Sequence, residues 1–175
     1  APELKGRVGL ISEMRDSVGL TLLSQGIDIT NPDSLTEDAF NAAVEFIAAQ
    51  VSSGQIFNIK GNSYGEDLTN GNIIAALAWS GDTTILNFEV GEDRFGFVVP
   101  DTGSTISSDS FVIPMGSQHK KNAEALINYY YDPVNAAELA AYVNYVTPVV
   151  GAKEEMLKTD PELANNPLIF PTEEL

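Results

Sequence analysis

Two carboxylates three residues apart, Glu13 and Asp16, stand where an apolar run gives way to an amphipathic segment. Residues 7–12 have the pattern of a short apolar strand, and residues 17–25 have that of a helix. The two acids therefore occupy a strand-to-helix turn, which is a common place for a ligand in proteins that alternate strands and helices. Side chains of this kind can pair with a cation.

Two further acids and two aromatic residues have similar settings. Asp82 follows the apolar run 73–79, which ends in Trp79, whereas Asp109 precedes a short apolar run and Tyr145 precedes a Thr-Pro turn. An ammonium over an aromatic face gains about 0.5–2 kcal/mol. Opposite charges about 4 Å apart attract by roughly 4 kcal/mol at an effective dielectric near 20, before the desolvation cost. This set suits a di- or polyamine; the alternative is that the acids are scattered over a solvated surface and that Trp79 packs in a core.

The composition limits the kinds of partner. Nine lysines and arginines stand against 25 acids, which gives a formal net charge of -16 and a pI near 4.1. Such a chain repels phosphate backbones and anionic headgroups, so nucleic acids and membrane surfaces are poor partners. The chain has no cysteine and one histidine, which removes disulfides, thiolate nucleophiles and the usual zinc sites. No metal ion and no cofactor is expected.

Apolar periodicity predicts an alternation of strands and helices. Strands are expected at 7–12, 55–60, 73–79 and 95–99, and helices at 17–25, 36–51, 65–70 and 83–88. This alternation is typical of an α/β fold with a mainly parallel sheet, helices on both faces and ligands at the carboxyl ends of the strands. Beyond a link rich in Gly, Ser and Thr, a strand is expected at 111–114, helices at 122–131 and 133–144, and short helices after 151.

One motif would suit an enzyme. Residues 61–65 match the G-x-S-x-G pattern that presents a nucleophilic serine, here Ser63, between a strand and a helix. The only histidine, His119, lies in a polar helix start and is a poor candidate for the base. A serine hydrolase fragment is therefore the alternative function, and the main interpretation is that the chain is not an enzyme.

Five short motifs occur in an order that resembles a known family. They are P-x-L-K-G at 2–6, W-x-G-D at 79–82, D-S-x-x-I-P at 109–114, A-x-x-x-I-N-Y at 123–129 followed by Asp-Pro, and Y-x-T-P at 145–148. In this order they resemble the spermidine/putrescine-binding proteins of ABC importers, within the extracellular solute-binding family. The likeness runs from residue 2 to about residue 151.

The resemblance implies a periplasmic-binding-protein-like lobe, one of two lobes that close on a polyamine between acids and aromatic rings. By position, it assigns ligand binding to Glu13, Asp16, Trp79, Asp82, Asp109 and Tyr145. One departure is Ser107, where family members often carry an aromatic residue. A receptor of the same fold for a different solute therefore stays open as a further alternative.

The resemblance also implies that the chain is a fragment, with a first lobe preceding it and a last helix following it. Residues 1–104 would form the second lobe, 105–150 a crossing segment that packs on the missing lobe, and 151–175 a return to the second lobe. The expected partners are the polyamine and the ABC permease subunits, and the expected location is periplasmic or extracellular, with a lipid anchor left open because no leader is present. Without the other lobe, a set of apolar residues is expected either to swap or pair with another copy of the chain or to repack onto the second lobe: Phe111, Val112, Ile113, Leu126, Ile127 and Val143.

Overall fold

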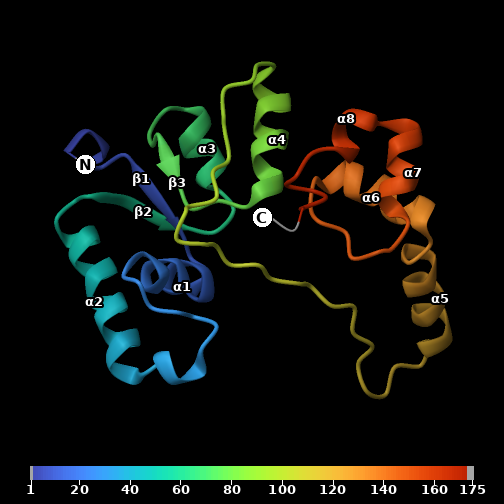
Figure 1. Ribbon diagram of the computed structural model, residues 1–175, viewed down its shortest axis with the longest axis horizontal. Coiled ribbons are helices and arrows are strands. Elements are labelled where there is room, and N and C mark those ends of the chain that lie inside the picture. The colour runs from blue at the N-terminus through green and yellow to red at the C-terminus, as the bar shows by residue number, and fades with distance from the viewer. Residues whose placement is uncertain (1, 173–175) are drawn as a thin grey trace. The chain divides into compact units, whose positions relative to one another are not determined.

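The computed structural model describes residues 2–172, which divide into two compact units (Figure 1). Unit 1 contains the residues up to Trp79 together with Leu86–Ser107, and unit 2 contains Ser80–Ile85 and the residues from Ser108 onward. Helix α4 (Ser80–Val90) contributes residues to both. The predicted ranges 1–104, 105–150 and 151–175 remain predictions about a two-lobed receptor.

Unit 1 is built on a parallel sheet in which β1 (Val8–Ile11) lies between β2 (Ile56–Lys60) and β3 (Ala75–Ala76). An irregularity between Val8 and Gly9 shifts the register of β1 against β2. Both pairings are parallel, so each connection must cross over a face of the sheet. The predicted α/β fold with a parallel sheet is confirmed.

The crossovers of unit 1 carry α1 (Met14–Ser24), α2 (Glu37–Ser52) and α3 (Tyr64–Thr69), with 3-10 turns at Pro2–Leu4 and Pro32–Ser34. In the order β2-β1-β3, right-handed crossovers put the β1-to-β2 helices and the β2-to-β3 helix on opposite faces. Figure 1 shows α1 and α2 on one side of the strands and α3 on the other.

Each face of this sheet has its own core. On the α3 side, Ile11, Tyr64 and Ile73 are buried together, and Trp79 packs against them. Between α1 and α2, a second cluster contains Val18, Leu22 and Ala43. An apolar pocket of about 440 Å³ opens beside this second cluster, and its lining comes from β1, β2, α1 and α2 without any of the predicted ligand-binding residues.

Unit 2 is helical. Beyond the first turns of α4 it contains α5 (Lys120–Tyr130), α6 (Pro133–Val143), α7 (Ala152–Thr159) and α8 (Pro161–Ala164). Its core combines small residues of α6 with larger ones from the C-terminal part: Ala136, Ala137, Ala140, Ala152, Met156, Ala164 and Ile169. The alanines let neighbouring helices approach closely, so Met156 and Ile169 are fully enclosed.

Three predicted strands differ from the structure. The run 73–79 forms only the two-residue strand β3, and the segments 95–99 and 111–114 form no strand. At the start of the segment 95–99, a local contact replaces the expected strand pairing. Asn87 Oδ1 accepts hydrogen bonds from the backbone N–H groups of Arg94 and Phe95 at 3.0 and 2.7 Å. These donors are thus satisfied by a helix side chain and not by a strand ladder. The segment 111–114 has strand-forming residues, but strand propensity needs a packed neighbouring strand to take effect.

Candidate ligand-binding site

Glu13 and Asp16 stand at the start of α1, directly after β1. Glu13 is the N-cap residue with an extended backbone, and its exposed side chain makes no capping hydrogen bond. Asp16 lies in the first helical turn, where a negative charge is favoured by the helix dipole. This turn is tied to the strand because the buried Ser17 Oγ donates to the Ile11 carbonyl at 2.6 Å. The predicted helix start at residue 17 was therefore three residues late, and both acids belong to the helix start itself.

Trp79 is held at the end of β3 by two hydrogen bonds. Its backbone N–H donates to Tyr64 Oη at 2.9 Å, and its indole Nε1–H donates to Asn62 Oδ1 at 3.2 Å. Trp79 is half-buried and packs against the core cluster of the α3 side, as the core-packing alternative expects, while part of the residue stays exposed. Contact of the ring with a ligand stays a prediction. Since β1 and β3 are adjacent parallel strands, Glu13 and Trp79 follow neighbouring carboxyl ends. The strand order reverses at this point, which is where open α/β sheets bind ligands.

Asp82 and Tyr145 come together within unit 2, although 63 positions separate them in the sequence. The Tyr145 hydroxyl donates to Asp82 Oδ1 at 2.9 Å. Burial raises the pKa of the Tyr145 phenol well above its ordinary value, and the adjoining Asp82 carboxylate raises it further. Tyr145 therefore stays a neutral donor throughout the physiological pH range.

Close packing of α4 on the end of α6 makes this pair possible. A Cβ added to Gly81 would lie 2.8 Å from the carbonyl oxygen of Val143, so only glycine fits there. Asn144 ends α6 in the left-handed conformation, with φ at 58°, and turns the chain toward Tyr145. Asn is one of the few residues other than glycine that adopt this conformation readily.

Asp109 lies in the exposed segment between α4 and α5. It belongs to unit 2 with Asp82 and Tyr145, whereas Glu13, Asp16 and Trp79 belong to unit 1. The structure thus brings together Asp82 and Tyr145 within one unit and sets Glu13 and Trp79 on adjacent strand ends in the other. That all six residues line one cleft stays a prediction.

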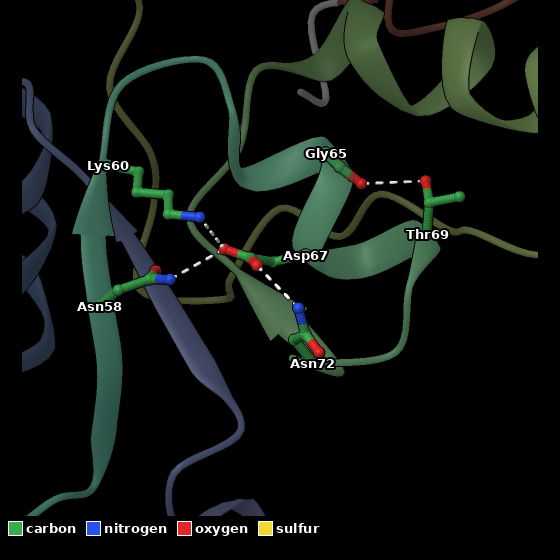
Figure 2. A network of polar contacts seen from close by, with 6 residues as sticks. All are labelled: Asn58, Lys60, Gly65, Asp67, Thr69 and Asn72. Carbon is green, nitrogen blue, oxygen red and sulfur yellow. Dashed lines mark hydrogen bonds and ion pairs between the residues drawn. The ribbon is translucent and has the colours of Figure 1, made fainter.

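An ion-pair network that the sequence did not reveal fixes the turn between β2 and α3 (Figure 2). Asp67, which is only 5% exposed, accepts hydrogen bonds from Lys60 Nζ at 2.6 Å, Asn58 Nδ2 at 2.8 Å and Asn72 Nδ2 at 3.0 Å. The hydrogen bond from Lys60, followed by those from Asn72 and Asn58, lowers the pKa of Asp67 to about 2. The turn that carries Asn62, the partner of Trp79, is thereby anchored at both ends.

Ser63 does not have the geometry of a nucleophile elbow. That motif places serine on a strained turn, but the backbone of Ser63 is ordinary, with φ at -77° and ψ at 7°. The residue precedes α3 in unit 1, whereas His119 precedes α5 in unit 2.

The described residues contain neither a metal-binding cluster nor a membrane-spanning helix. Between residues 2 and 172, no group of three or more acidic or histidine side chains is arranged to hold a metal ion. Within the same range, no helix is both long and apolar enough to cross a membrane.

Comparison with known proteins gives a consistent result. The family described as bacterial extracellular solute-binding protein matches residues 1–171. The spermidine/putrescine-binding periplasmic protein 1 of Haemophilus influenzae is 22% identical over 175 residues, which cover 99% of this chain and 46% of that protein. The putrescine-binding periplasmic protein PotF of Escherichia coli is 29% identical over 120 residues, covering 63% of this chain and 30% of PotF.

A solved structure agrees with these relatives. A protein of Listeria monocytogenes assigned to a spermidine/putrescine ABC transporter superposes with a TM-score of 0.76 at 28% identity, over 99% of this chain and 50% of its own. The chain spans about half the length of the curated relatives that it matches along its whole length. With the family match over nearly all residues, the chain belongs to the bacterial extracellular solute-binding proteins, as its motifs predicted.

Proposed function

We propose that this chain forms the polyamine-binding part of a receptor that delivers putrescine or spermidine to an ABC importer. The observation that carries the proposal is the position of Glu13 and Trp79, an acid and an aromatic ring that follow adjacent parallel strands. Relatives named for spermidine and putrescine binding cover the whole chain and support the same ligand class. The receptor works outside the cytoplasmic membrane, in the periplasm or the extracellular space, and hands its ligand to the permease subunits without changing it.

In this proposal the acids and the rings have different roles. The carboxylates of Glu13, Asp16, Asp82 and Asp109 pair with the ammonium groups, and Trp79 covers the methylene chain between them. Tyr145 orients the Asp82 carboxylate by the hydrogen bond between their side chains. Because its hydroxyl stays protonated, it adds no charge that would repel the cation-binding acids further.

The proposed self-association rests on the exposure of apolar side chains in unit 2. Phe111, Val112 and Leu126 are exposed by 55%, 80% and 66%. In a two-lobed receptor such residues would be covered by the other lobe, and in this chain alone they would favour pairing of copies. Light scattering of the 175-residue chain tests this, since a strictly monomeric chain at high concentration contradicts it.

Calorimetry with putrescine tests the ligand class. The control ligand is 1,4-butanediol, which has the same carbon chain but no charge. We expect putrescine to bind, the diol not to bind, and the dissociation constant for putrescine to rise with NaCl because the interaction is between charges. Asp82→Asn should weaken binding, whereas Glu162→Asn, which changes an exposed acid of α8, should not. Equal binding of the diol, or no binding of putrescine, would contradict the proposal.

A further inference from the structure

Thr105 contacts one of the predicted ligand-binding acids from a distant part of the sequence. Its Oγ1–H donates to Asp16 Oδ1 at 2.6 Å, across 89 positions. This distance lies in the range of a charge-assisted hydrogen bond from a hydroxyl to a carboxylate. Thr105 is half-buried, whereas its neighbours Ser104 and Ile106 are exposed. The segment that leads from α4 toward α5 is therefore attached to α1 at this residue, within unit 1.

The methyl group of Thr105 lies over the same helix. Gly19 follows Asp16 by three residues and so lies on the same face of α1. It is buried, and a Cβ placed on it would stand 3.5 Å from Thr105 Cγ2 and 3.8 Å from Ile29 Cδ1. Thr105 thus covers Gly19 with its methyl group while its hydroxyl reaches Asp16. The hydroxyl and the methyl group of Thr105 are thus both directed at α1, which distinguishes this arrangement from a chance hydrogen bond at the surface.

We infer that Thr105 is a positioning residue for the ligand-binding carboxylate of Asp16. A carboxylate has about four acceptor positions, and the Thr105 hydroxyl occupies one of them. The hydrogen bond restricts the rotation of the Asp16 side chain and leaves the other positions for an ammonium group. The same bond fixes the segment around Thr105 on α1, so that binding at Asp16 and the order of this segment are linked. The effect on the ligand rests on the proposed function, whereas the attachment of the segment does not.

Two substitutions separate the hydroxyl from the methyl group. Thr105→Val keeps the shape and the contact with Gly19 but removes the donor, and Thr105→Ser keeps the donor but removes the methyl group. We expect Thr105→Val to weaken putrescine binding by about 3–10-fold and Thr105→Ser to stay within about twofold of the unchanged chain. Thr102→Val, an exposed position of the same segment, is the matched control and should have no effect.

The attachment is measured without ligand. In ¹⁵N relaxation of the 18.8 kDa chain, the order parameters of residues 104–106 should fall in Thr105→Val and not in Thr105→Ser or Thr102→Val. Unchanged order parameters in Thr105→Val would overturn the attachment. Far-UV circular dichroism of each variant verifies that it folds.

Measurements of putrescine binding separate the positioning role of Thr105 from the proposed function of the chain. In an Asp16→Ala background, Thr105→Val should have little further effect on putrescine binding, because Thr105 acts through Asp16. If the unchanged chain binds putrescine and Thr105→Val binds it equally well, the positioning role is refuted. If the unchanged chain binds no polyamine, the proposed function fails, and the relaxation data still decide whether Thr105 holds the segment.

Discussion

Substitution of Gly81 by alanine should destabilise the contact between α4 and the end of α6. The added Cβ would lie 2.8 Å from Val143 O, 3.0 Å from Asn144 O and 3.0 Å from Tyr145 Cζ. Two of these neighbours are backbone atoms, so the helix start itself must move. Overpacking of this kind costs about 1–3 kcal/mol, and the better helix propensity of alanine returns at most about 1 kcal/mol. We expect a net loss of about 1–2 kcal/mol in the free energy of unfolding.

Urea unfolding followed by circular dichroism and by the fluorescence of Trp79, the only tryptophan, measures this loss. Gly19→Ala is the matched control, because it is also a helical glycine but its Cβ would meet its neighbours only at 3.5 and 3.8 Å. That variant should be as stable as the unchanged chain or more stable by up to about 1 kcal/mol. The displacement should also part Tyr145 from Asp82 and lower the pH at which the phenol ionises. A Gly81→Ala variant as stable as the Gly19→Ala variant would refute the reasoning.

Three further outcomes follow from the packing and the ionisable groups. Because the folded-state pKa of Asp67 is lowered to about 2 from 3.8, its charged form stabilises the fold above about pH 4, and this stabilisation is lost as the pH falls toward 2. Asp67→Asn should therefore flatten the acid-unfolding curve in this window, and a curve parallel to that of the unchanged chain would contradict it. Tyr145→Phe should lower the free energy of unfolding by about 1 kcal/mol, since the hydrogen bond to Asp82 is charge-assisted but partly exposed. The same variant should leave the tyrosinate absorbance below about pH 11 unchanged, because the pKa of Tyr145 lies above the ordinary range of a phenol. Ile73→Ala, at a residue only 1% exposed, should cost about 2–5 kcal/mol in urea unfolding, whereas Ile73→Val should cost about 0.5–1.5 kcal/mol.

The sequence predicts the helices and strands that are specified by neighbouring residues, such as helix caps, turn residues and a clear apolar period. Helix α2 was expected at 36–51 and is found at Glu37–Ser52, because Thr36 accepts the Ala39 N–H as an N-cap and the apolar period is clear. Strands β1 and β2 are likewise predicted, as short apolar runs with turn residues around them. The strand expected at 95–99 does not form. At its first residue, Asn87 of the preceding helix accepts a hydrogen bond from the Phe95 N–H and donates one to the Phe95 carbonyl, and apolar periodicity carries no signal of this contact.

The sequence proposes residue types for the candidate site but does not predict the contacts between them. Glu13, Asp16, Trp79 and Asp82 were proposed from their places after expected strands, and Asp109 and Tyr145 from the resemblance to solute-binding proteins; their role in binding stays a prediction. The bonds of Tyr145 to Asp82 and of Thr105 to Asp16 span 63 and 89 positions, so they depend on how whole elements pack. Thr105 in particular carries no local signal, since a threonine in a link rich in Gly, Ser and Thr has the appearance of a solvated residue.

The central position of β1 has a consequence for the newly synthesised chain. Of the described strands it is the first to be made, yet both of its partners come much later in the sequence. At a synthesis rate of roughly 5–20 residues per second, the ribosome needs about 2–10 s to extend the chain from Ile11 to Lys60. During this interval the apolar run of β1 has both edges open, and any strand of another nascent chain can pair with it. The danger of aggregation should therefore be greatest before the second strand emerges.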